Sequence, residues 1–180
     1  MALEGSGYLY SLAAIAITFV GFSALVVVLR QTYGGALSSL EIFITRVFIQ
    51  LGFIVAASAM VPNLLSLFPV PHGVIWQVSS AAAAVPASVF AVTYPARRRA
   101  AAGVRTPLVV WLDICVLLLA AIILAINAAG VPFEPGPGLF AVALTIILFL
   151  SGWAYLQALN VLLRHHLTGR DGAPGALSER

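Results

Sequence analysis

Two ionisable residues fall inside long apolar segments, where charged side chains are rare. Asp113 lies seven residues past Thr106, about 10 Å along a helix from the start of its segment. Arg46 lies five residues past Glu41, about 7–8 Å into another segment. An arginine can extend its apolar stem to a polar surface, whereas a short carboxylate at that depth must be paired, hydrated or protonated. Asp113 is therefore the first candidate functional residue, and Arg46 is its candidate counter-charge.

Polar side chains of two apolar segments fall at a similar depth. Gln50 lies one turn after Arg46 on the same helix face, and Gln157 and Asn160 share one stripe of the last segment. We expect these three residues to converge with Asp113 and Arg46 on a polar cluster open toward the cytoplasm. Two interpretations stay open. The cluster could fix helix register through hydrogen bonds of about 0.6 kcal/mol each, or it could bind or move a proton or small cation.

The residues that the sequence lacks exclude several classes of protein. All nine basic residues are arginine, so the chain has neither a Schiff-base lysine nor a P-loop lysine. The single cysteine, Cys115, cannot form an internal disulfide, a CxxC pair or a cysteine-based zinc site, and we expect it in the apolar core. The histidines, His72, His165 and His166, lie outside the apolar segments, so no metal or haem is expected. No nucleophile–base pair has workable spacing, and we expect neither an enzyme nor a cofactor.

The composition indicates the environment that surrounds these residues. Of the 180 residues, 62% are hydrophobic and only 8% are charged, and the mean hydropathy is +1.07. Soluble domains carry about 25% charged residues, so this chain cannot cover a water-facing surface. Its richness in Ala, Gly, Pro and Arg, without lysine, is typical of a GC-rich genome. We therefore expect a multi-pass protein of a bacterial plasma (inner) membrane.

Five segments are long and apolar enough to cross a bilayer, which takes about 20 residues of helix. They predict an all-α bundle of five transmembrane helices over residues 8–29, 42–68, 74–94, 108–129 and 139–163. We expect residues 1–167 to form a single membrane domain and residues 168–180, rich in Gly and polar residues, to form a disordered cytoplasmic tail. The connecting segments are too short to hold a soluble domain.

The arginines orient the predicted bundle. With the C-terminus in the cytoplasm, all nine lie on the cytoplasmic side, with Arg46 in the inner part of its apolar segment, as the positive-inside rule requires. The prediction is therefore N-out and C-in. Five arginines near helix ends are expected to contact lipid headgroups, namely Arg97, Arg98, Arg99, Arg105 and Arg164. On the outer side, Tyr8 and Trp76 are expected to anchor the helices at the membrane interface.

Residue size predicts which helices face protein. Lipid tails are as apolar as leucine, so close packing of small residues, rather than hydrophobicity, brings helices together in a membrane. The third segment carries small residues four apart, at Ser79, Ala83, Ala87 and Ala91, and we expect neighbours to enclose it. The fourth is large and aliphatic from residue 116 to 126, and we expect it to have a broad lipid face in its outer half.

These features predict an integral membrane protein that acts through helix packing or assembly with partners, without enzymatic activity. The alternative is a small oligomeric channel or transporter for protons or small cations, in which Asp113 binds the ion and Arg46 is its counter-charge. The expected partners are membrane lipid and either further copies of the chain or a larger membrane complex. Nucleic acid is not expected, because the arginines are explained by topology.

Overall fold

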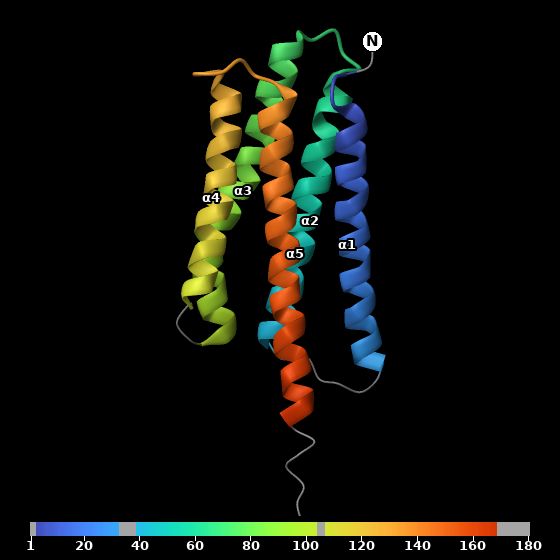
Figure 1. Cartoon of the computed structure of the whole chain (residues 1–180), viewed down its shortest axis with the longest axis vertical. Helices are drawn as coiled ribbons and strands as arrows, with labels where there is room; N and C mark the ends of the chain where they lie inside the picture. Colours follow the sequence, from blue (N-terminus) through green and yellow to red (C-terminus); the bar gives the residue numbers. More distant parts are fainter. Residues whose placement is uncertain (1–2, 33–38, 104–106, 169–180) are drawn as a thin grey trace, which may run out of the picture.

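The computed structural model describes residues 3–32, 39–103 and 107–168, the side chains of residues 26, 30–31, 102 and 158–168 excepted. These residues form five helices and no strand (Figure 1). The helices are α1 (Ser6–Thr32), α2 (Ser39–Leu65), α3 (His72–Ala102), α4 (Leu108–Ala129) and α5 (Pro137–Thr168). Each contains a stretch long and apolar enough to span a membrane, which confirms the prediction of five such helices. The predicted tail beyond residue 168 lies outside the described residues.

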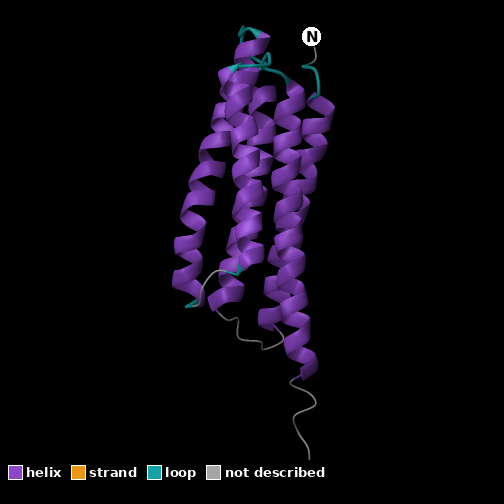
Figure 2. Cartoon of the chain, turned by 60° about the vertical axis from the view of Figure 1, so that its left-hand side comes forward, coloured by secondary structure: helices purple, strands orange, loops and turns teal. Residues whose placement is uncertain are grey.

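The five helices run alternately up and down in one bundle, and the loops gather at its two ends (Figures 1 and 2). α2 is central, because it packs against α1, α3 and α5. α4 packs against α3 and α5, and in the described part of the chain it contacts neither α1 nor α2. We call the end at which α1, α3 and α5 finish the arginine end. It carries Arg46 near the start of α2 and residues 97–99 near the end of α3.

α1 and α2 pack tightly at Gly52. A Cβ atom on this glycine would overlap Val20 Cγ2 and would lie 3.5 Å from the carbonyl oxygen of Ala16. All three residues are buried. A glycine at this position lets two backbones come together, as small residues do at contacts between membrane helices. The contact therefore rests on close packing, which any larger side chain at residue 52 would disturb.

α3 is longer than the sequence predicts. Proline removes one N–H donor and disfavours helical backbone at the residue before it, so the segment was expected to end at Tyr94, before Pro95. The helix instead continues through Pro95 to Ala102. It ends at Gly103, whose φ of 64° lets its N–H bond the carbonyl oxygen of Arg99 at 3.0 Å. The three adjacent arginines therefore lie on the last turns of a helix and not in a loop.

The prediction that neighbours enclose α3 is wrong for one of its sides. The small residues at positions 79, 83, 87 and 91 are buried, as expected. The side away from α2 and α4, however, exposes a row of valines that includes Val85, Val89 and Val92, the last 72% exposed. Only two neighbours cover α3 extensively, and α2 is the more enclosed helix. The broad exposed face predicted for the outer half of α4 is present at Leu119 and Ile122, and it extends to Leu112 in the other half.

Two predicted side-chain environments are also wrong. Trp76, expected at the membrane interface, is only 4% exposed, and its ring lies 5.8 Å from that of Phe140 in α5. Cys115, expected in the core, is exposed because it lies on the side of α4 away from α3 and α5.

Candidate functional site

Asp113 lies in the second turn of α4, near the arginine end, and is half-buried. In the described part of the chain no hydrogen bond or ion pair joins it to another residue. Tyr94 and Arg98 are one turn apart on α3, which packs along α4. Arg98 is therefore a charged residue on the helix beside Asp113, at a similar distance from the arginine end.

The structure does not bring the predicted charge pair together. Arg46 is exposed on α2, and α2 and α4 do not contact each other among the described residues. Of the other residues predicted in the cluster, Gln50 is half-buried and bonds to α3, and Gln157 is half-buried on α5. The side chain of Asn160 lies outside the described residues. Equal depth along two helices fixes height in the bundle but not which helices are neighbours.

The three adjacent arginines of α3 have three different environments. Arg97 Nη2 donates a 2.8 Å hydrogen bond to Gln50 Oε1, and its guanidinium lies 5.6 Å from the centre of the Phe90 ring. Arg98 Nη1 is buried and has no hydrogen-bond partner in the described part of the chain. Arg99 is exposed. Because successive helical residues are rotated by about 100°, the run is divided among three directions.

Of the other arginines expected at lipid headgroups, Arg105 and the side chain of Arg164 lie outside the described residues.

Five polar residues near the arginine end form what we call the arginine-end cluster, namely Gln50, Tyr94, Arg97, Arg98 and Asp113. An aromatic layer supports it, since the Tyr94 ring lies 5.6 Å from that of Phe43 and 5.8 Å from that of Phe90.

Sequence reasoning missed Tyr94, Arg97 and Arg98 as members of this cluster because it ended the helix at Pro95. A signal for the longer helix was present. Residues 96–102 read ARRRAAA, and alanine and arginine are among the strongest helix formers. Proline is tolerated inside membrane helices, so this run favoured a helix that continues past Pro95.

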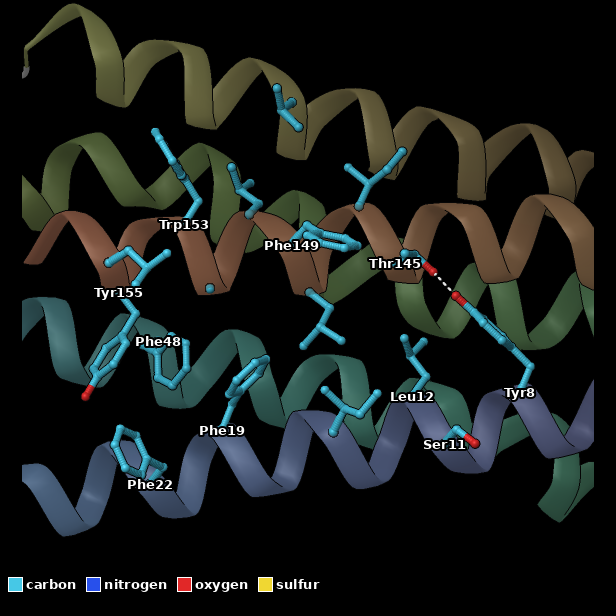
Figure 3. Close-up of a pocket in the computed structure, with 17 residues that line it drawn as sticks. Tyr8, Ser11, Leu12, Phe19, Phe22, Phe48, Thr145, Phe149, Trp153 and Tyr155 are labelled. Atoms are coloured by element: carbon cyan, nitrogen blue, oxygen red, sulfur yellow. Dashed lines mark hydrogen bonds between the residues drawn. The ribbon is translucent and has the colours of Figure 1, made fainter. Parts of the chain in front are cut away.

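An apolar groove of about 950 Å³ runs between α1 and α5, with α2 behind it (Figure 3). At one end Tyr8 and Thr145 join across it through a 2.6 Å hydrogen bond. Thr145 donates its own hydroxyl hydrogen to the carbonyl oxygen of Ala141 at 2.7 Å, so Tyr8 is the donor to Thr145. Toward the arginine end, the Tyr155 ring of α5 lies 4.8 Å from that of Phe48 in α2.

The groove walls are hydrocarbon over most of their length. α1 contributes Phe19 and Phe22, and α5 contributes Phe149 and Trp153 (Figure 3). All four side chains are exposed, so the groove opens to the side of the bundle. An opening of this kind faces lipid or another chain if the helices span a membrane.

In the part of the chain that the structure describes, no group of three or more His, Cys, Asp or Glu residues could hold a metal ion. Comparison of the chain with protein-family models, with curated proteins and with solved structures finds no match. The five apolar helices indicate a multi-pass membrane protein. The groove and the arginine-end cluster are the two candidate functional sites of the described part of the chain.

Proposed function

We propose that this chain is an integral protein of a bacterial plasma membrane, oriented N-out and C-in, that acts without enzymatic activity by packing its helices against a partner chain. The observation that carries the proposal is the apolar groove between α1 and α5, which opens sideways. A groove lined by large exposed aromatic side chains offers dispersion contacts to another helix, and such contacts drive association in lipid.

The outward side of α1 supports the same proposal. Small residues occupy it at alternating intervals of four and three, namely Gly7, Ser11, Ala14, Thr18 and Gly21, and all five are exposed. They lie opposite the face that packs on α2. Ser11 Oγ and Thr18 Oγ1 donate to carbonyl oxygens of their own helix at 3.0 and 2.8 Å, so neither hydroxyl needs a partner elsewhere. A Cβ atom on Gly7 or Gly21 would meet nothing within 4 Å, so this side leaves room for a second backbone.

The simplest partner is a second copy of the chain, and a cysteine crosslink tests whether two copies assemble. In a Cys115→Ser background, Ala14→Cys should crosslink two copies in native membranes through the outward side of α1. Leu119→Cys, on the exposed face of α4, is the matched control and should not. Gly21→Ile should abolish the Ala14→Cys crosslink by adding bulk to the contact. A crosslink that is equally strong at both cysteines, or absent at Ala14→Cys, would contradict assembly through α1.

Membrane insertion and orientation have their own test. Glu134 is exposed in the connection between α4 and α5, and Arg99 is exposed at the arginine end. In intact cells an impermeant maleimide should label Glu134→Cys, whereas Arg99→Cys should react only after the membrane is opened. The reverse pattern would overturn the orientation. Labelling of both residues in intact cells would overturn insertion as a five-helix bundle.

One observation favours the rival function, a small channel or transporter for protons or small cations. Asp113 is half-buried, and in the described part of the chain it has no ion pair. It does not line the groove, nor a smaller hollow between α1 and α2 beside Ile17 and Phe53. Flux of protons or monovalent cations into proteoliposomes decides the matter. Flux through the wild type that Asp113→Asn abolishes would establish transport, and flux at the level of empty liposomes in both would exclude it.

A further inference from the structure

The arginine-end cluster contains opposite charges that do not neutralise each other by direct contact. Arg98 Nη1 is buried without an acceptor, and Asp113 on the adjoining helix has no ion pair in the described part of the chain. They lie on two helices that pack together, four residues from the end of α3 and five residues from the start of α4. Burying a guanidinium N–H without an acceptor is costly, and so is burying a carboxylate without a donor. The two poles therefore suit a ligand that can meet both.

We propose that Arg98 and Asp113 together bind the headgroup of a phosphatidylethanolamine-type lipid. The phosphate would accept hydrogen bonds from Arg98, and the primary ammonium would donate to the Asp113 carboxylate. An anion alone would meet Arg98 but would be repelled by Asp113, and a cation alone would have the reverse difficulty. Of the zwitterionic headgroups, choline has no N–H to donate, so charge and hydrogen bonding together favour ethanolamine.

The position of the two residues along their helices fits a headgroup. Arg98 lies four residues before the end of α3 at Ala102, and Asp113 lies five residues after the start of α4 at Leu108. Both are thus about 6–8 Å from the arginine end of their helices. The 22 residues of α4 make it about 33 Å long, close to the roughly 30 Å thickness of the hydrocarbon core. The proposal rests on the membrane insertion proposed above.

The neighbouring arginines do not compete for this role. Arg97 is already bonded to Gln50 and lies against Phe90, which ties α3 to α2. Arg99 is exposed, and no described carboxylate pairs with it. Arg98 is the member of the run whose buried N–H has no acceptor in the described part of the chain. The site is therefore specific to one arginine and is not a general effect of positive charge.

Lipid-dependent thermal stability of the purified full chain in detergent tests the proposal. Phosphatidylethanolamine, phosphatidylcholine and phosphatidylglycerol with identical dioleoyl chains are added separately, and native mass spectrometry counts the lipid retained. We expect the ethanolamine lipid to raise the Tm most and to be retained as one molecule per chain. Equal shifts for the three lipids in the wild type would overturn the proposal, whatever the variants do.

Two variants separate the poles of the site. Arg98→Gln should weaken binding of the ethanolamine lipid about tenfold or more. Asp113→Asn should remove the preference for ethanolamine and improve binding of phosphatidylglycerol. Arg99→Gln, the control, should keep the wild-type order. An ethanolamine preference that survives both variants would place the lipid elsewhere and contradict the proposal.

A further arm identifies the source of the headgroup chemistry. Glycerophosphoethanolamine carries the same phosphate and ammonium but no acyl chains, and it should stabilise the protein far less than the lipid. An equal effect would overturn the assignment to a lipid in favour of a soluble ligand. The result is independent of the cysteine labelling and crosslinking experiments. Those experiments would fail if insertion or assembly were wrong, whereas the lipid order would fail if only the headgroup site were wrong.

Discussion

Asn127 Nδ2 donates a 2.7 Å hydrogen bond to Ser80 Oγ, and both side chains are fully buried between α4 and α3. The same amide nitrogen donates to the carbonyl oxygen of Gly136 at 3.2 Å, and Gly136 N–H donates back to Asn127 Oδ1 at 3.0 Å. One side chain therefore joins two helices and the connection between α4 and α5 at the end of the bundle opposite the arginines.

Asn127→Ala should destabilise the protein by about 1–3 kcal/mol, because it leaves a buried hydroxyl and a backbone N–H without their partners. Unfolding in mixed micelles, followed by tryptophan fluorescence, measures the change. Asn63 in α2 provides the control, since its Nδ2 is buried but has no hydrogen-bond partner among the described residues. Asn63→Ala should therefore cost much less. Equal losses for the two variants would mean that the Asn127 hydrogen bonds contribute little.

Gly52→Ala should loosen α1 from α2, because the added methyl group would overlap Val20. The expected cost is about 1–3 kcal/mol, typical of overpacking. Gly138→Ala is the control, as its Cβ would meet nothing within 4 Å. Adding Val20→Ala to Gly52→Ala should recover part of the lost stability. If the double variant is as unstable as the sum of the single variants, the two residues are not in contact.

Tyr8→Phe should remove the bond that closes one end of the groove and should cost about 0.6 kcal/mol, the average for hydrogen bonds between membrane helices. Tyr10→Phe is matched in chemistry and lies in the same turn, but no hydrogen bond of its hydroxyl occurs in the described part of the chain. It should be neutral. The difference between the unfolding midpoints of the two variants isolates the hydrogen bond to Thr145. If Tyr8→Phe destabilises the protein no more than Tyr10→Phe does, α1 and α5 are held together by packing alone.

Arg97 and Gln50 should show a coupling of about 0.5–1.5 kcal/mol in a double-mutant cycle with Arg97→Leu and Gln50→Leu. Their hydrogen bond is partly buried and charge-assisted, so it should survive solvent screening better than a surface contact. The parallel cycle with Arg99→Leu and Gln50→Leu should be additive. Coupling in the second cycle of the same size would mean that charge near α2, and not the observed bond, is responsible.

The number of helices and the bounds of α4 could be predicted because composition and length decide them. Proline at residue 107 and glycine at residue 130 flank α4, and the structure places both at its ends. Pro95 misled the same reasoning, because α3 continues through it, as membrane helices can through a proline. Local sequence patterns thus predicted the apolar segments correctly but placed the end of α3 too early.

The candidate site could be predicted only in part. Depth along the chain correctly marked Asp113 and Gln50 as polar residues near one end of the bundle. It also paired Asp113 with Arg46, although α2 and α4 do not contact each other in the described part of the structure. Neighbour order among apolar helices depends on the shapes of opposing surfaces, such as the Gly52–Val20 contact, and these are not visible in a linear pattern.

The continuation of α3 through Pro95 changes how a charge-neutralisation experiment must be interpreted. A run of three arginines in a loop would act as one electrostatic signal during insertion, and its members would be interchangeable. On a helix the same run gives one residue to interhelical packing, one to a buried position beside α4 and one to the surface. Replacing all three together would therefore alter folding and topology in a single step. Only single replacements, with Arg99 as the reference, can separate the two effects.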